Sequence, residues 1–176
     1  LKMLTVHKGE LMVEEKGIYS IEKFLVSRRL MYWQVYLHKT VLCAEQMLIR
    51  IIKRAKYIKA STQLPLNQFI NEPVETVTLE QFCNLDDYDI VSAIKGWCTH
   101  EDKILSFLSR GIINRVLLKV KYFPEPVNDK LMEEKTSEAM QKMNFSAEDA
   151  AWLVFTGEAS NSTYNFEDER INILFK

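Results

Sequence analysis

Basic and aromatic side chains alternate in one stretch of the sequence, between residues 27 and 40. The basic members are Arg28, Arg29, His38 and Lys39, and the aromatic members are Tyr32, Trp33 and Tyr36. Guanidinium and ammonium groups donate hydrogen bonds to phosphates, while tyrosine rings and hydroxyls suit a sugar or a base. Together, these side chains could bind a nucleotide.

The stretch lies in a region predicted to be helical from residue 21 to about residue 59, as one long helix or as two in near-continuation, because it contains no Gly or Pro. At about 100° per residue its apolar side chains occupy nearly all sides of the helix, so we expect the helix to be buried. A buried cation needs a carboxylate or a bound anion, because an unpaired charge is costly in a low dielectric. Spacing alone favours structural ion pairs, with Glu22, Glu45 or the acids after Leu85, over an anion site, and both remain open.

The composition is that of a soluble globular protein. The chain has 176 residues, of which 47% are apolar, and its 23 Lys and Arg against 24 Asp and Glu give a net charge of −1. These values argue against disorder and against a strongly basic polyanion-binding protein. No apolar run approaches the roughly 18 residues of a membrane span, and no signal-peptide pattern is present, so we expect a cytoplasmic location.

The three cysteines do not predict a disulfide framework or a metal site. Cys43, Cys83 and Cys98 are odd in number and form no C-x-x-C motif. Cys98 lies close to His100, but two ligands do not make a zinc site. We therefore expect a reducing compartment and no bound metal in this chain.

The pattern of elements predicts a mainly α fold with a small α+β part. A hairpin around Gly9 precedes the long helical region, and further helices are expected around residues 79–84, 87–98, 101–109, 129–143 and from Ser146, with Gly111 as the C-cap of the third of these. Strands are expected at residues 115–122, 152–155, 163–166 and 171–175. The expected division is a helical region over residues 1–114 and an α+β region over residues 115–176.

Both ends of the chain enter strand-like sequence directly, at Leu4-Thr5-Val6 and at residues 171–175. Natural termini are usually polar and frayed. We therefore expect a fragment of a longer protein, truncated at both ends.

Residues 27–40, SRRLMYWQVYLHKT, resemble a segment that follows the catalytic core in HD-domain phosphohydrolases of the deoxynucleoside triphosphate triphosphohydrolase type. The family pattern there is roughly R-x-x-[ML]-[YH]-x-x-x-Y-x-H-K. Residues 9–11, 16–21, 82–90 and 113–119 are also similar to that family, the last through an R-x-x-x-K strand. The resemblance covers about residues 3–122 and implies that the intact protein hydrolyses (deoxy)nucleoside triphosphates.

The resemblance also implies roles for single residues. Arg28 matches an arginine that contacts the substrate triphosphate, and Tyr36 matches a tyrosine against the sugar. Five further residues match positions that hold an activating nucleotide at a subunit junction: Lys16, His38, Lys39, Arg115 and Lys119. Arg115 and Lys119 could equally be outward-facing residues of a one-sided sheet. Glu14 departs from the pattern, because some activated members are basic there.

The family's metal ligands come from an H…HD…D set, which this chain lacks, because its histidines are His7, His38 and His100 and none precedes an Asp. The divalent metal (Mn, Mg, Fe or Zn) is therefore expected in an N-terminal HD core outside this sequence. By this interpretation the chain alone is inactive and contains no catalytic residue. Its expected partners are a nucleoside triphosphate and further copies of the protein in a homo-oligomer.

Two other functions fit parts of the sequence. A non-catalytic helical module for oligomerisation or regulation would also account for the long apolar helix. Nucleic-acid binding by the basic residues 50–59 is the weaker idea, because cations are common at the C-terminal end of a helix, where they complement its dipole. We predict no nucleic-acid partner and no membrane partner.

Overall fold

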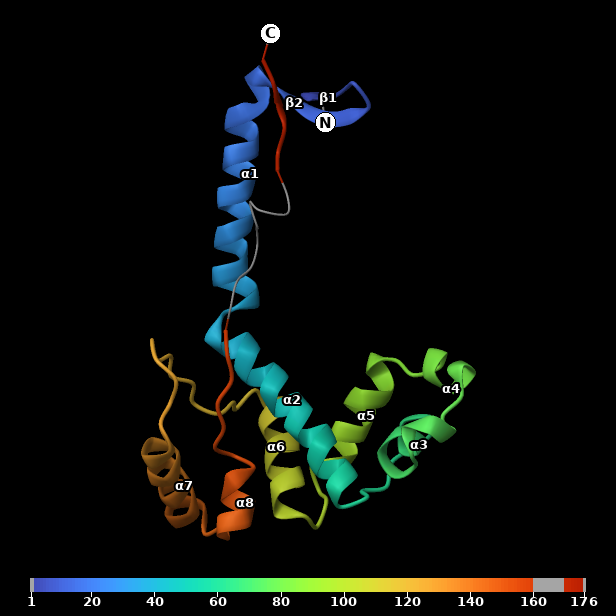
Figure 1. The fold of residues 1–176 in the computed structure, drawn as a ribbon. Helices are drawn as coiled ribbons and strands as arrows, with labels where there is room; N and C mark the ends of the chain where they lie inside the picture. The colour runs from blue at the N-terminus through green and yellow to red at the C-terminus, as the bar shows by residue number, and fades with distance from the viewer. Residues whose placement is uncertain (1, 160–169, 176) are drawn as a thin grey trace. The chain divides into compact units, whose positions relative to one another are not determined.

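A computed structural model describes residues 2–159 and 170–175 of the chain. The chain divides into two compact units, residues 1–38 with 158–176 and residues 39–157. The boundary between these units follows His38, whereas the sequence suggested a division after residue 114. The described part is mainly helical with one small sheet, which confirms the predicted fold class (Figure 1).

The sheet belongs to the first unit and begins with the predicted hairpin. Strands β1 (Leu4–His7) and β2 (Glu10–Glu14) are antiparallel, with Leu4 opposite Val13 and His7 opposite Glu10. Lys8 and Gly9 join them with φ values of 50° and 84°, the left-handed pair that a tight hairpin turn requires. Strand β3 (Ile173–Leu174) pairs in parallel with β2, and it is shorter than the strand predicted there.

The long helical region is interrupted, as the second of the two predicted alternatives allowed. The single turn η1 (Glu15–Gly17) leads into α1 (Ile18–Met31), which continues into a π-helical turn, η2 (Tyr32–Tyr36). The next helix, α2 (Lys39–Tyr57), begins two residues after η2 ends and belongs to the second unit.

The expectation that this region is buried is wrong for α1. The helix has no buried residue, and the side chains of Phe24, Val26 and Leu30 are 57%, 57% and 51% exposed. Apolar residues on all sides of a helix indicate a surface that avoids water, but they do not say which segment or which molecule covers it.

The second unit is built on the contact between α2 and α6 (Lys103–Ile113), which lie side by side (Figure 1). One stripe of α2, spaced by four residues, is buried: Cys43, Met47, Ile51 and Ala55. It packs in one core cluster with Ile104, Leu105 and Leu108 of α6. The other elements of the unit are α3 (Leu66–Asn71), η3 (Val74–Thr76), α4 (Leu79–Cys83), α5 (Asp87–Trp97), α7 (Asp129–Met143) and α8 (Ala147–Ala151).

The starts of α4, α5, α7 and α8 lie where the sequence predicted them, and a side chain caps each of these helices. The Asp86 carboxylate accepts hydrogen bonds from the N–H groups of Tyr88 and Asp89 at the start of α5. Ser146 accepts one from the N–H of Asp149 in α8. Such caps satisfy backbone donors that the first helical turn leaves free. Local chemistry therefore determines these boundaries.

The end of α6 was predicted wrongly. Gly111 is not its C-cap but lies buried inside the helix. A Cβ there would be 2.8 Å from Met47 Cε and 3.0 Å from the carbonyl oxygen of Val116, so the glycine permits close packing on α2. The helix ends at Ile113, and the left-handed residue that follows its C-cap is Arg115 (φ 57°). The N–H of Val116 donates to the Gly111 carbonyl, and the N–H of Arg115 to the Ile112 carbonyl. This is the hydrogen-bond pattern of a Schellman cap.

Residues 115–122 and 152–155, predicted as strands, are not strands in the structure. Leu117, Leu118 and Val120 pack against the core as the apolar run suggested, but from an irregular segment. A strand needs a neighbouring strand to bind its backbone, and composition cannot show whether one is present. The strand predicted at residues 163–166 lies outside the described residues.

We predict that Gly111→Ala lowers the free energy of unfolding by about 1–2 kcal/mol, because the forced shift of Met47 and of the Val116 carbonyl outweighs the gain in helix propensity. Gly96→Ala in α5 is the matched control. A Cβ at Gly96 meets nothing within 4 Å, so this change should stabilise the protein by up to about 1 kcal/mol. Urea denaturation measures both, and a Gly111→Ala variant as stable as the parent would contradict the packing described.

Candidate functional site

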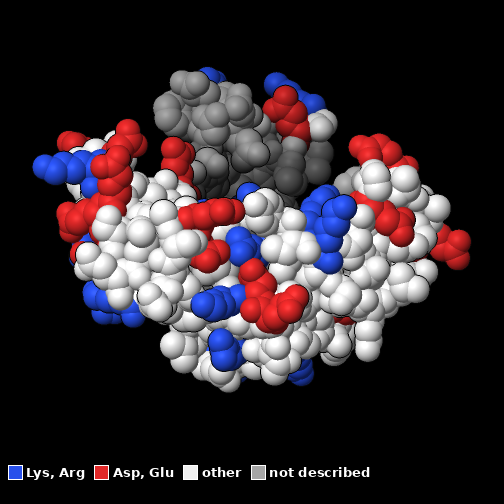
Figure 2. Space-filling model, turned by 90° about the horizontal axis from the view of Figure 1, so that it is seen from below, with Lys and Arg blue, Asp and Glu red and all other residues white. Residues whose placement is uncertain are grey.

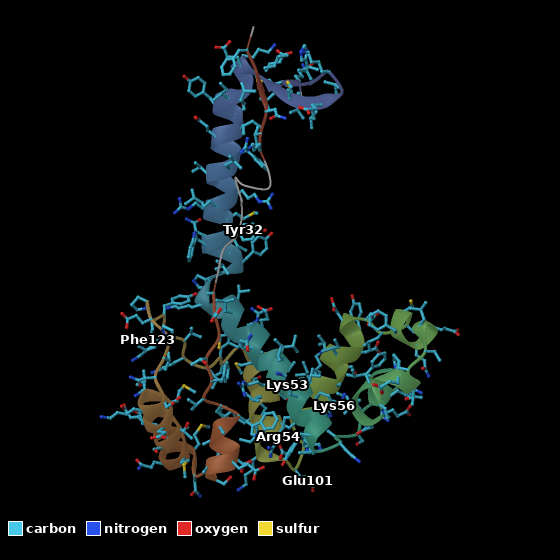
Figure 3. The ribbon with its side chains drawn as sticks, viewed as in Figure 1. Tyr32, Lys53, Arg54, Lys56, Glu101 and Phe123 are labelled. Carbon is cyan, nitrogen blue, oxygen red and sulfur yellow. The ribbon has the colours of Figure 1, made fainter. Side chains whose placement is uncertain are left out.

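Arg28, Tyr32 and Tyr36 form a row that runs from the last turn of α1 into η2 (Tyr32 is labelled in Figure 3). The guanidinium carbon of Arg28 is 5.7 Å from the centre of the Tyr32 ring. The rings of Tyr32 and Tyr36 are 5.0 Å apart between centres and meet edge to face at 61°. Both contacts are favourable electrostatically. The structure thus connects Arg28 with Tyr36 through Tyr32, which the sequence did not single out for this role.

The π-helical turn explains how residues eight apart come to one side. In an unbroken α-helix they would differ by about 80° in direction. In η2 the N–H of Leu37 donates to the carbonyl of Tyr32 at 2.8 Å, five residues back, so each residue rotates the chain by less than in an α-helix. Tyr36 therefore turns back toward the side of Arg28. Such turns are rare and occur frequently at functional sites.

The cations of this stretch are accessible rather than buried, contrary to expectation. Arg28, Arg29 and Lys39 are exposed, and none of them forms an ion pair with the described residues. The structural ion pairs that spacing favoured are therefore not found for these three residues. Their charges remain available to a ligand.

Lys16 is in a different situation. Its ammonium group lies 2.7 Å from Glu14 Oε2, so the acidic residue that departs from the family pattern offsets the charge of its neighbour. The Lys16 side chain is 64% exposed, and a surface pair of this kind contributes at most about 1 kcal/mol. His38 follows η2, and its N–H donates to the carbonyl of Val35.

The remaining candidates, Lys39, Arg115 and Lys119, are exposed residues of the second unit. The thiol of Cys43, one turn along α2 from Lys39, donates to the carbonyl of Leu118 at 3.2 Å. Burial raises the pKa of this thiol, more than the bond to Leu118 lowers it, and so keeps the donor protonated. This hydrogen bond holds Leu118, the residue before Lys119, against α2 at a point one turn along the helix from Lys39.

The structure also contains a buried charge cluster that the sequence did not reveal. Arg54 in α2, labelled in Figure 3, is 6% exposed. Its Nη2 lies 2.7 Å from Asp102 Oδ2 and 3.1 Å from Asp149 Oδ1, and its Nε donates to Asp102 Oδ1. The rings of Tyr57 and Trp152 lie 5.5 and 5.2 Å from the guanidinium carbon. This cluster joins α2 to the start of α6 and to α8.

The cluster determines the charge state of its members. Burial alone would raise the pKa of the Asp102 carboxyl, but the hydrogen bond and charge of Arg54, together with the hydrogen bond from the Leu105 N–H, hold it below its usual value. Burial would likewise lower the pKa of Arg54, and the two carboxylates reverse that effect. The cluster is therefore an ion pair near neutral pH, and its role is structural.

The arginines of the basic stretch at residues 50–59 are therefore not free for nucleic acid. Arg54 is paired, and Arg50 stacks on Phe155 at 3.9 Å and has its pKa lowered by burial. On the face seen in Figure 2, basic and acidic side chains are intermixed. The helical position of Arg54 could have predicted that it is buried and needs an acidic partner, because it lies on the same side of α2 as Ile51 and Ala55.

The described residues do not fit a metal ion, because they contain no group of three His, Cys, Asp or Glu side chains that could hold one. The Cys98 thiol donates to the Ile94 carbonyl, and His100 Nδ1 accepts from the N–H of Asp102. No chemical step can therefore be assigned to a metal held by this part of the chain. Across the same residues, every helix is too short or too polar to cross a membrane.

Residues 1–150 match the family described as the HD associated region, and the chain belongs to that family. It is 32% identical over 130 residues to the uncharacterized protein YwfO of Bacillus subtilis (strain 168), covering 70% of this chain and 29% of that protein. It is also similar to the crystal structure of a phosphohydrolase from Bacteroides thetaiotaomicron VPI-5482, with a TM-score of 0.91 and 40% identity. That match covers 99% of this chain and 46% of the other, so the chain spans less than half of either relative.

We predict that the stability of the protein falls with acid partly through Asp102. Because its folded pKa is depressed, its contribution is present above the unfolded value of about 4 and is lost as the pH falls through the folded value. Asp102→Asn should cost about 3 kcal/mol at neutral pH and flatten the loss of stability below pH 4. Denaturation at a series of pH values measures this. Glu133→Gln, on an exposed residue of α7, is the control and should change neither the stability at neutral pH nor its loss below pH 4.

Proposed function

We propose that this chain is the C-terminal part of an HD-superfamily phosphohydrolase that acts on (deoxy)nucleoside triphosphates. In this proposal it contributes residues that contact the phosphates and the sugar, together with contacts between subunits. Membership of the HD associated region family and the similarity to a solved phosphohydrolase support the general class. The divalent metal of such an enzyme would be held by the HD core outside this chain and would supply an activated water or a bridge to the phosphate.

The observation that supports the substrate contacts best is the row of Arg28, Tyr32 and Tyr36. In the proposal the guanidinium of Arg28 donates two hydrogen bonds to phosphate oxygens and neutralises their charge. The ring of Tyr36 packs against the sugar, because a flat apolar face with a polar edge suits a ribose. Such a donor stabilises the transition state by several kcal/mol once the substrate and the rest of the enzyme exclude water.

We predict that Arg28→Ala lowers kcat/KM of the full-length protein by about 100- to 1000-fold for dGTP or another deoxynucleoside triphosphate with Mn²⁺ or Mg²⁺. The matched control is Arg29→Ala, which removes the same group from the neighbouring position and should change kcat/KM by less than about threefold. Equal turnover by the Arg28→Ala variant and the parent would exclude Arg28 from substrate binding.

A second nucleotide site is proposed for the other basic residues. By the resemblance to nucleotide-activated members of the family, these residues would contact an activating nucleotide at a junction between subunits: Lys16, His38, Lys39, Arg115 and Lys119. The hydrogen bond between Cys43 and Leu118, which holds the Lys119 segment against α2 near Lys39, supports part of this set.

We predict that Lys119→Ala and Lys39→Ala each raise the nucleotide concentration needed for half-maximal activation of the full-length enzyme about tenfold, because each removes a charged phosphate contact. Rates measured against activator concentration give this value. Lys121→Ala, on an exposed lysine two residues further along the segment, is the control and should leave it unchanged. Identical activation curves for all four proteins would contradict the second site.

The exposed apolar side chains of α1 and η2 support the proposed assembly role. Phe24, Val26, Leu30, Trp33 and Val35 are each more than half exposed. Apolar surface of this extent commonly marks an interaction site. The alternative function, a non-catalytic oligomerisation or regulatory module, rests on the same surface. It would be favoured if the full-length protein hydrolysed no nucleoside triphosphate yet formed oligomers.

A further inference from the structure

We infer that Tyr32 is a positioning residue that holds Arg28 and Tyr36 on one side of the chain in the geometry that a nucleotide requires. The inference deepens the proposed function and rests on it. In this view the ring of Tyr32 acts on the substrate only through its two neighbours.

The first argument concerns Arg28. An arginine side chain loses about 2 kcal/mol of rotamer entropy when it is held in one conformation. Arg28 is exposed and has no carboxylate among the described residues to hold it. Its contact with the Tyr32 ring, at 5.7 Å, restrains the guanidinium without consuming the hydrogen-bond donors that a phosphate would need.

The second argument concerns Tyr36. The carbonyl of Tyr32 accepts the hydrogen bond that defines the π-helical turn, from the N–H of Leu37, and the ring of Tyr32 meets that of Tyr36 across the same turn. The backbone bond and the ring contact therefore favour the same conformation. If the turn became α-helical, Tyr36 would rotate away from Arg28.

The third argument is that the side chain of Tyr32 is less exposed than those of the residues on either side. Tyr32 is half-buried, whereas Met31 and Trp33 on either side are 41% and 51% exposed. Tyr32 is thus less exposed than the side chains beside it, and its ring contacts Arg28 and Tyr36. Tyr19 of α1, which is 81% exposed and forms no ring contact with the described residues, is the control for the loss of an aromatic side chain.

The test compares Tyr32→Phe, Tyr32→Leu and Tyr19→Leu in the full-length enzyme, by steady-state hydrolysis of a deoxynucleoside triphosphate. Tyr32→Phe keeps both ring contacts and should stay within about twofold of the parent. Tyr32→Leu removes them and should lower kcat/KM about tenfold, while Tyr19→Leu stays within about twofold. Tyr32→Gln is assayed in parallel, so that a folding defect specific to leucine does not decide the result.

A mutant cycle separates positioning from a merely structural role. If Tyr32 acts only through Arg28 and Tyr36, adding Tyr32→Leu to a variant that carries both Arg28→Ala and Tyr36→Ala should lower kcat/KM by less than about twofold more. A full tenfold further loss would overturn the inference, as would a defect in Tyr32→Phe equal to that in Tyr32→Leu, which would indicate a role of the hydroxyl. If Arg28→Ala alone has no effect, the proposed function fails. If Arg28→Ala is impaired while Tyr32→Leu and Tyr32→Gln match the parent, the positioning role alone fails.

Discussion

A buried guanidinium needs acidic partners, because a charge removed from water is costly when it is unpaired. In the second unit this constraint applies to Arg54, which connects three of the helical elements. Asp102 and Asp149 supply the compensating charges, and they come from the start of α6 and from α8. Asp102 also accepts the hydrogen bond that begins α6, so one carboxylate pairs the cation and sets a helix boundary. The apolar contact of α2 with α6 buries most of the surface, but apolar packing tolerates several relative positions of the two helices. The charge cluster allows few of these positions, because moving the helices apart would leave Arg54 or a carboxylate buried without its partner.

Arg54 and Arg28 differ in what their guanidinium groups contact. Both are arginines on apolar-rich helices, and both lie near tyrosine rings. Arg54 is enclosed and donates hydrogen bonds to the protein's own acids. Arg28 is exposed, and within the described residues its guanidinium contacts only the ring of Tyr32. An aromatic face orients a cation and leaves its N–H donors free. This difference, rather than the count of basic residues, makes Arg28 the candidate for a phosphate.

The candidate site depends on backbone geometry as much as on side-chain chemistry. The spacing of Arg28 and Tyr36 is visible in the sequence, and so is the pattern that resembles HD-domain phosphohydrolases. Their common direction depends on the π-helical turn between them, for which we know no sequence signal of comparable clarity. The contact between Cys43 and Leu118 likewise depends on the tertiary structure, because it joins residues 75 positions apart in the sequence.

The hairpin, the starts of α5, α7 and α8, the mainly helical class and the link to HD-type phosphohydrolases could be predicted from the sequence, because turns, caps and local motifs depend on residues within a few positions of one another. The sequence did not predict that Gly111 lies inside α6, that residues 115–122 form no strand, that α1 is exposed or that Arg54 is paired. Each of these outcomes depends on which distant segment comes into contact, Met47 for Gly111 and Asp102 for Arg54. The periodicity of apolar residues indicates which side of a helix avoids water, but it does not indicate which segment packs against that side.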